Sequence, residues 1–292
     1  MVRFVDDVGA AVPLPSEVCR VVSLVPSLTE ALAVSCREKL VGATNWCTHP
    51  ADLVVARVGG TKSPDLNTIS ALAPDLVVAN AEENRPVDLD VLRGQGIAVW
   101  VTDIRTVDQA LASIETLLRA VGGSDLGWLH QARSSWAHTP AVAQDRRLRA
   151  VVPIWRRPWM HLGSDTYAGD VLRRLGVDNV LGDSPQRYPK LGLEQLPEVD
   201  LVVLPDEPYQ FSQADGPESF PATPCALVSG RLLTWYGPAM VEAPPELRKS
   251  LRAALISADA ARRPPPAEEG ERDAYMRRCE APLKSRIDPE AH

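Results

Sequence analysis

Two stretches of this chain repeat one pattern, and the repeat constrains the fold more than any other feature. Residues 66–84 read LNTISALAPDLVVANAEEN, and residues 193–209 read LEQLPEVDLVVLPDEPY. Each stretch is a short helix-like segment followed by the apolar run DLVV and an acidic loop. Because the two copies occupy matching places in the two halves of the sequence, we expect two structural repeats of one α/β lobe.

The first apolar run of the chain leads directly into a helical pattern. The run RVVSLV at residues 20–25 is apolar without alternation, which is typical of a strand buried on both faces of a parallel sheet. Pro26 ends this run, and Ser27 with Glu30 forms a capping-box pattern that predicts Glu30 as a helix cap. A helix that starts at the carboxyl end of a strand presents backbone N–H groups where open α/β folds bind ligands. We therefore expect Pro26 and Ser27 at a ligand-binding cleft.

Strand-like and helix-like segments alternate through most of the chain, which predicts an α/β fold with parallel sheets in two Rossmann-like lobes. We expect the first lobe over residues 1–122 and the second over residues 148–258. Between them, residues 124–137 have a helical pattern. Residues 259–292 are rich in Arg, Pro and Glu, and we expect little fixed structure there.

Composition excludes several partner classes. Of the 292 residues, 45% are hydrophobic and 24% are charged, as in soluble globular proteins. The net charge is −7 and no basic cluster is present, so nucleic acid is not an expected partner. No apolar run approaches the roughly 20 residues that span a bilayer, so membrane insertion is not expected either. The start MVRFVDDVGAAVPLP lacks the pattern of a signal peptide. As written, the chain is expected to be a cytoplasmic monomer, or periplasmic or at the cell surface if its N-terminus is trimmed or misassigned.

Motifs of enzymes and metal sites are weak. The sequence has no GxSxG, GxxxxGK[ST] or GxGxxG motif, so we expect no catalytic residues and no catalytic cofactor. Cys47 and His49 carry side chains that suit zinc or copper, but two ligands do not make a site. A structural role for their loop is favoured.

Aromatic residues indicate a ligand. The chain has seven Trp and three Phe, and in both halves large aromatic side chains follow predicted strands: Trp46, Trp155, Trp159, Tyr209, Trp235 and Tyr236. Loops at the strand ends of two facing lobes open onto one cleft, where such side chains favour a large, partly apolar ligand with rings. The alternative is that some of these Trp residues seal the junction between the lobes. Near the same cleft, Arg156 and Glu82 are expected to contact the ligand or to form ion pairs.

Four segments together resemble one known family. They read RVVSLVPSLTEAL, VGGTKSPDLNTISALAPDLVVAN, RPWMHLGSDTYAGDVLRRLGVDNVLGD and YPKLGLEQL. Over residues 5–256 the chain resembles the iron-chelate and vitamin B12 family of periplasmic binding proteins, a helical-backbone metal receptor type, and most of all its cobalamin-binding branch. The resemblance implies two lobes joined by a single long connecting helix at about residues 124–145, within a linking region at 123–147. It also implies a ligand cleft between the lobes and delivery of the chelate to an ABC importer.

The resemblance also implies roles for particular residues. Trp46 matches an aromatic position that packs on the corrin ring. Glu194 matches a glutamate that docks onto arginines of the importer permease, and Asp52 is the acidic residue nearest the expected first-lobe counterpart. Pro140 falls within the expected linking helix, so that helix is predicted to be shorter or kinked.

The sequence therefore predicts a substrate-binding protein for a corrinoid, such as cobalamin, or a related metal chelate, serving an ABC importer. One alternative is a cytoplasmic carrier or sensor of corrinoid, haem or siderophore with the same fold and no transporter. An enzyme that acts on a tetrapyrrole is a third, less favoured reading.

Overall fold

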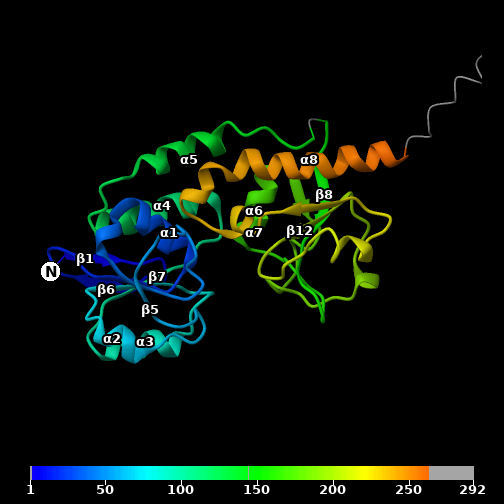
Figure 1. The fold of residues 1–292 in the computed structure, drawn as a ribbon. Helices are drawn as coiled ribbons and strands as arrows, with labels where there is room; N and C mark the ends of the chain where they lie inside the picture. The colour runs from blue at the N-terminus through cyan, green and yellow to red at the C-terminus, as the bar shows by residue number, and fades with distance from the viewer. Residues whose placement is uncertain (1, 144, 263–292) are drawn as a thin grey trace, which may run out of the picture. The chain divides into compact units, whose positions relative to one another are not determined.

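The computed structural model describes residues 2–143 and 145–262, and the first half forms a five-stranded parallel sheet (Figure 1). Its strand order is β5-β4-β3-β6-β7. The strands are β3 (Val21–Ser23), β4 (Leu40–Ala43), β5 (Ala56–Arg57), β6 (Leu76–Asn80) and β7 (Val99–Thr102). Ahead of this sheet, β1 (Val2–Val5) and β2 (Ala11–Leu14) form an antiparallel hairpin.

Helices cover both faces of this sheet. In Figure 1, α1 and α4 lie on one side of the strands, and α2 and α3 on the other. The helices are α1 (Pro26–Cys36), α2 (Leu66–Ala71), α3 (Pro86–Gly94) and α4 (Val107–Ala120). Successive strand residues point to opposite faces, so Val21 and Leu76 join one core, while Val22 and Val77 join the other. This double burial explains why the strands read as unbroken apolar runs.

The start of α1 corrects the predicted capping box. The helix begins at Pro26, its N-cap is Val25, and no side chain caps it. A proline at the first helical position already has the required φ and lacks an N–H that would need a partner. Ser27 therefore lies inside the first turn, and the buried Glu30 forms an ion pair with Arg231 of the second half instead of capping.

The second half repeats this topology with four parallel strands in the order β11-β8-β12-β13. These are β8 (Leu148–Val151), β11 (Val177–Asn179), β12 (Leu201–Pro205) and β13 (Cys225–Val228). The two DLVV runs form β6 and β12, each between the opening strand and the last strand of its sheet. The predicted α/β fold with two related lobes is confirmed.

Further elements complete the second half. A small hairpin pairs β9 (Pro153–Trp155) with β10 (Met160–His161). The helices are α6 (Tyr167–Arg174), α7 (Gly230–Thr234) and α8 (Ala243–Arg262), with 3₁₀ turns η2 (Leu193–Gln195), η3 (Pro217–Ser219) and η4 (Pro238–Val241). A further turn, η1 (Arg37–Lys39), follows α1.

The linking helix is shorter than the resemblance implies. Helix α5 spans Gly127–Ala137, and residues 138–143 and 145–147 are not helical. Pro140 explains why the helix cannot continue, since proline lacks the N–H and clashes with the preceding turn. The domain limits drawn from the sequence stay predictions. At the other end α8 continues to Arg262, so residues 259–262 of the predicted irregular tail are helical, and residues 263–292 lie outside the described part.

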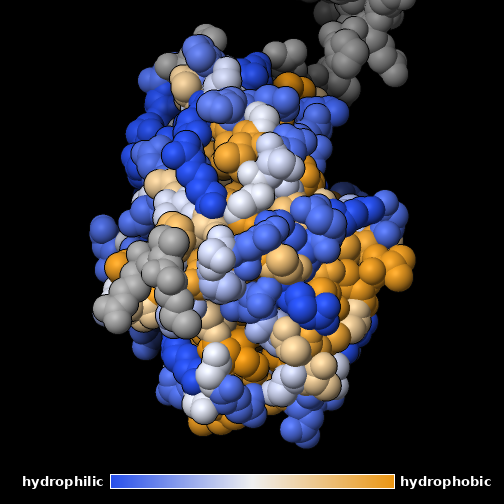
Figure 2. Space-filling view, turned by 90° about the vertical axis from the view of Figure 1, so that its left-hand side faces the viewer, coloured by the Kyte–Doolittle hydropathy of each residue, from blue (hydrophilic) through white to orange (hydrophobic). Residues whose placement is uncertain are grey.

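The surface is mixed in character. The face in Figure 2 is largely hydrophilic, with hydrophobic side chains in patches. No helix in the described part of the chain combines the length and apolarity needed to cross a membrane.

Candidate functional site

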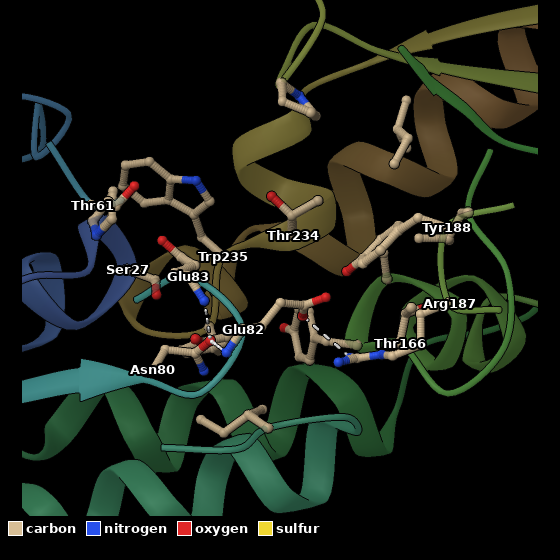
Figure 3. A pocket seen from close by; sticks show the side chains of 18 of the residues that line it. Ser27, Thr61, Asn80, Glu82, Glu83, Thr166, Arg187, Tyr188, Thr234 and Trp235 are labelled. Atoms are coloured by element: carbon tan, nitrogen blue, oxygen red, sulfur yellow. Dashed lines mark hydrogen bonds and ion pairs between the residues drawn. The ribbon is translucent and has the colours of Figure 1, made fainter. Parts of the chain in front are cut away.

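A cavity of about 760 Å³ lies between the two lobes and is called the interlobe cavity below. Its volume is in the range of small-molecule and cofactor sites. First-lobe residues on its wall are Pro26, Ser27, Thr61, Lys62, Asn80, Glu82, Glu83 and Ile104. Second-lobe residues on its wall are Ile154, Met160, Leu162, Thr166, Tyr167, Ala168, Arg187, Tyr188, Pro208, Thr234, Trp235 and Tyr236. Figure 3 shows several of them around the cavity.

Two asparagines fix the acidic loop after β6. The side-chain oxygen of Asn80 accepts hydrogen bonds from the backbone N–H groups of Glu82 at 2.9 Å and Glu83 at 3.2 Å. Asn84 accepts from the Asn80 N–H at 2.9 Å and donates to the Thr61 carbonyl at 2.9 Å. This network closes a tight loop whose side chains Glu82 and Glu83 line the interlobe cavity.

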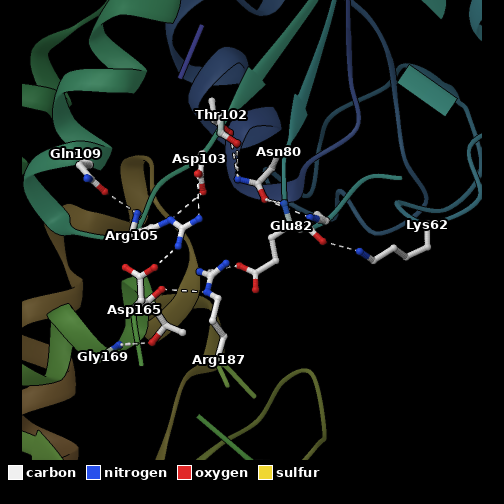
Figure 4. Close-up of polar contacts among 12 residues, drawn as sticks. Lys62, Asn80, Glu82, Thr102, Asp103, Arg105, Gln109, Asp165, Gly169 and Arg187 are labelled. Atoms are coloured by element: carbon white, nitrogen blue, oxygen red, sulfur yellow. Dashed lines mark hydrogen bonds and ion pairs between the residues drawn. The ribbon is translucent and has the colours of Figure 1, made fainter. Parts of the chain in front are cut away.

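The cations on the cavity wall already have partners (Figure 4). Arg187 forms an ion pair with Glu82 at 3.2 Å and donates to the Asp165 carbonyl at 3.0 Å. Lys62 donates to the Glu82 backbone carbonyl. Arg105 bridges Asp103 and Asp165. The pairs of Arg187 and Arg105 join the two lobes.

Glu83 differs from its neighbour Glu82. Within residues 2–143 and 145–262, its carboxylate has no hydrogen-bond or ion-pair partner. Burial, together with the negative charge of Glu82, raises the pKa of Glu83 to about 7. Glu83 is therefore a carboxyl group whose charge changes near neutral pH and which is available to a ligand.

The second-lobe wall is aromatic. Tyr167 and Tyr236 meet edge to face with ring centroids 5.6 Å apart, and burial raises the pKa of both phenols. The rings of Trp235 and His49 meet edge to face with their centroids 5.4 Å apart. The Arg231 guanidinium lies 5.9 Å from the Trp235 ring centroid. Flat side chains that are fixed by such contacts offer stacking area at low entropic cost.

The structure places half of the ligand-binding residues predicted from the sequence on the cavity wall: Pro26, Ser27, Glu82, Trp235 and Tyr236. The other five are not among the lining residues: Trp46, Trp155, Arg156, Trp159 and Tyr209. Trp46 is 67% exposed, and its indole nitrogen lies beside Gly60, next to the lining residue Thr61. A role for these five in ligand binding stays a prediction.

The four second-lobe residues of this group pack against one another. Trp159 stacks on Phe211 with ring centroids 6.2 Å apart, and Trp155 meets Tyr209 edge to face with ring centroids 5.7 Å apart. Arg156 forms ion pairs with Asp215 and Glu218 and lies 5.3 Å from the Trp159 ring centroid. Trp159 and Tyr209 pack against the small core around Phe211, whereas Trp155 is 43% exposed. Position after a strand therefore did not separate cavity residues from packing residues.

Several cavity residues were not assigned from the sequence. Tyr188 and Lys62 lie in irregular segments whose path no periodic pattern predicts. Tyr167 has the helical spacing of a core residue, and it is buried, yet it lines the interlobe cavity. Glu83 belonged to the predicted acidic loop, but only the structure shows that its carboxylate has no partner among residues 2–143 and 145–262.

The two residues expected to dock a permease are exposed. Glu194 lies in η2 (Leu193–Gln195). Asp52 forms a two-pronged ion pair with Arg37 at 2.7 and 2.9 Å, which lowers the pKa of the Asp52 carboxyl. Their docking roles stay predictions.

Cys47 and His49 are engaged in packing. The Cys47 thiol is buried within 3.0 Å of the Thr29 hydroxyl and 3.1 Å of the Thr44 hydroxyl, and burial raises its pKa. His49 contacts Thr48 and Trp235. In the described residues, no group of three or more His, Cys, Asp or Glu could hold a metal ion.

Comparison with known proteins identifies the family. Residues 21–204 match the family described as periplasmic binding protein. The vitamin B12-binding protein of Vibrio cholerae serotype O1 is 27% identical over 191 residues, which cover 64% of this chain and 68% of that protein.

Two solved structures share the fold. The periplasmic vitamin B12-binding protein of Vibrio cholerae has a TM-score of 0.65 at 19% identity, covering 82% of this chain and 99% of its own. The periplasmic haem-binding protein of Roseiflexus sp. RS-1 has a TM-score of 0.67 at 20% identity, covering 82% and 100%. At these identities the likeness shows the fold alone. The family match, however, spans more than half of the sequence, and the chain therefore belongs to the periplasmic binding protein family.

Proposed function

We propose that this protein is a substrate-binding protein for a corrinoid, such as cobalamin, or a related metal chelate, and that it serves an ABC importer without catalysing a reaction. The observation that carries the proposal is the interlobe cavity, with polar groups on one wall and aromatic rings on the other. A rigid, partly apolar chelate with hydrogen-bonding groups at its edge matches such a cavity.

The relatives support this ligand class. Proteins described as vitamin B12-binding share 27% identity with the chain, and both vitamin B12-binding and haem-binding proteins share its fold. Corrinoids and haem are both large planar metal chelates. The aromatic wall formed by Tyr167, Tyr188, Trp235 and Tyr236 suits the flat face of such a ligand.

Docking to a permease is part of the same proposal. Glu194 is exposed, so arginines of a permease can reach it, and it has no ion-pair partner among the described residues that they would have to displace. Asp52 is exposed as well, but permease arginines would have to compete with Arg37 for it. We therefore assign the main docking contact to Glu194 and a weaker one to Asp52.

Ligand titration tests the proposed function. Trp235 lies on the cavity wall, so a bound corrinoid or haem, which absorbs light strongly, quenches its fluorescence. We expect saturable quenching and a raised melting temperature with cyanocobalamin, haemin or a ferric siderophore, and recovery of the ligand unchanged. If none of the three binds, the ligand class is wrong; if the ligand is recovered altered, the protein is an enzyme.

A further inference from the structure

The first-lobe wall of the interlobe cavity holds a carboxylate, Glu83, that has no hydrogen-bond or ion-pair partner among the described residues. The loop of Asn80 and Asn84 fixes the backbone of Glu83, and the Glu83 side chain lines the cavity. Its neighbour Glu82 is paired with Arg187, whereas Glu83 has no partner among the described residues. Glu83 is partly buried, and a bound ligand would cover it further. Covering a carboxylate without a partner is unfavourable, so a ligand that supplies a hydrogen-bond donor here gains affinity.

The groups that face Glu83 make this part of the cavity negative. Glu82 comes from the same loop, and Glu207, from the segment after β12, adds a second acidic group. Tyr236, from the segment after α7, is a protonated phenol. The nearby cation, Lys62, donates to the Glu82 carbonyl, and Arg187 is held by Glu82 and Asp165. A ligand carboxylate placed beside Glu83 would therefore meet like charge.

Two buried hydroxyl groups on the same cavity point independently to a ligand. Ser27 is 3% exposed and Tyr167 is 5% exposed, and both line the cavity. The hydroxyl oxygens of both lack a hydrogen-bond partner in the described residues. Buried polar groups are usually satisfied, so these two are expected to find partners on a bound molecule. A primary amide has a carbonyl oxygen that accepts hydrogen bonds and an NH₂ group that donates them. The hydroxyl groups of Ser27 and Tyr167 can donate to the amide carbonyl, and the Glu83 carboxylate can accept from the amide NH₂.

We propose that Glu83 is the specificity-determining residue of the interlobe cavity, selecting metal chelates whose edge carries amides and rejecting chelates whose edge carries carboxylates. This rests on the proposed function, which supplies the chelate. Ser27 and Tyr167 complement Glu83 by donating to amide carbonyl oxygens. Among tetrapyrrole-like chelates, corrinoids with amide side chains are then favoured over haem, which carries carboxylates.

The selection depends on pH, because burial and the Glu82 charge raise the pKa of Glu83 to about 7. At pH 8 the ionised Glu83 repels a ligand carboxylate. At pH 6 Glu83 is mostly protonated and can donate a hydrogen bond to that carboxylate. Rejection of carboxylated chelates therefore weakens as the pH falls from 8 to 6.

Matched corrinoids test the selection directly. Dicyanocobinamide carries amides at its corrin edge, and dicyanocobyrinic acid carries carboxylates on the same ring and metal. At pH 8 we expect the native protein to bind the amide form at least about tenfold more tightly, as a hydrogen bond to a charged group and the repulsion of like charges imply. Glu83→Gln should reduce this ratio to about threefold or less, and Glu83→Asp, which keeps the charge, should preserve it. Glu246→Gln, an exposed carboxylate on α8, is the matched control and should leave the ratio unchanged.

The outcomes separate this proposal from the proposed function. If neither corrinoid nor haemin binds the native protein, the proposed function fails and the selection fails with it. If the corrinoids bind but Glu83→Gln keeps the native ratio, the function stands and the role of Glu83 is wrong. A native preference for the carboxylated form would also overturn it, since Arg187 or Lys62 would then be recruited to the ligand.

Discussion

The two walls of the interlobe cavity come from sheets of the same topology, yet they differ in chemistry. The first-lobe loops supply hydroxyl, amide, ammonium and carboxylate groups, from Ser27 to Glu83. The second-lobe segments supply four aromatic rings and most of the apolar side chains. Duplicated topology therefore places two strand-end surfaces face to face, while the loop residues give them different chemistry. In the proposed function, the polar wall selects polar groups of the ligand and the aromatic wall provides contact area.

Two ion pairs that join the lobes, Glu30–Arg231 and Glu82–Arg187, form the two sides of what is called the junction below. Outside the cavity lining, buried Glu30 of α1 pairs with Arg231 of α7, which also pairs with Glu242. At the cavity, the more exposed Glu82 pairs with Arg187. Ion pairs that differ in burial should differ in energetic weight.

The largest effect is expected when the buried junction is broken. Arg231→Ala leaves Glu30, which is 6% exposed, with an uncompensated buried charge. We expect the free energy of unfolding to fall by about 3 kcal/mol, measured by urea denaturation. The double variant Glu30→Gln with Arg231→Leu should recover part of the loss, because it removes both charges.

An exposed ion pair provides the control for this experiment. Arg37→Ala removes the partner of Asp52 on the surface and should leave the free energy of unfolding nearly unchanged. Equal losses for Arg231→Ala and Arg37→Ala would contradict the view that burial makes the Glu30–Arg231 pair important.

Binding should depend most on the aromatic wall. Trp235→Ala removes a ring that lines the cavity and that His49 and Arg231 hold in place. We expect the binding free energy of a chelate to weaken by about 2–3 kcal/mol, as for a central aromatic contact. Isothermal titration calorimetry measures this, because the variant lacks the Trp235 fluorophore. Trp46→Ala, at an exposed position outside the lining, should cost less than about 1 kcal/mol. The opposite order would show that the ligand contacts the loop of Trp46 rather than the cavity wall.

The sequence predicted the fold further than the site. The apolar run at residues 20–25 and the two DLVV runs are local features, and they correctly predicted β3, β6 and β12. Glu30 shows the limit: its spacing from Ser27 fits a cap, but its partner Arg231 lies 201 residues away. Local spacing contains no information about such a pairing.

The division of aromatic residues shows the same limit at the site. Trp159 and Trp235 both follow predicted strands, but Trp159 stacks on Phe211 within the second lobe and Trp235 lines the cavity. Residues that are distant in the sequence determine whether a loop side chain points into the cavity or into the lobe. The sequence therefore located the cleft at the strand ends, but only half of the residues it predicted for the site line the cavity.

Glu83, on the polar wall of the cavity, should lower the free energy of unfolding of the unliganded protein at neutral and alkaline pH. The pKa of Glu83 is raised from 4.5 to about 7, so the folded state binds the proton more tightly than the unfolded state. Its contribution to stability is complete below pH 4.5 and is lost as the pH rises through 7. We expect Glu83→Gln to raise the free energy of unfolding by about 1 kcal/mol at pH 8 and to have little effect at pH 4.5. A gain that is equal at both pH values would mean that the carboxylate is not buried as described.

The smallest effect is expected for the ion pair at the cavity, and it sharpens the contrast between the two sides of the junction. Glu82 and Arg187 are 35% and 26% exposed in their side chains and lie 3.2 Å apart. A double-mutant cycle with Glu82→Gln and Arg187→Gln should give a coupling of about 0.5 kcal/mol at low salt. Because water and ions reach this pair, the coupling should diminish at about 1 M salt. A coupling that is large and independent of salt would instead show that the Glu82–Arg187 pair is as shielded from water and ions as the Glu30–Arg231 pair. Both pairs would then hold the lobes together.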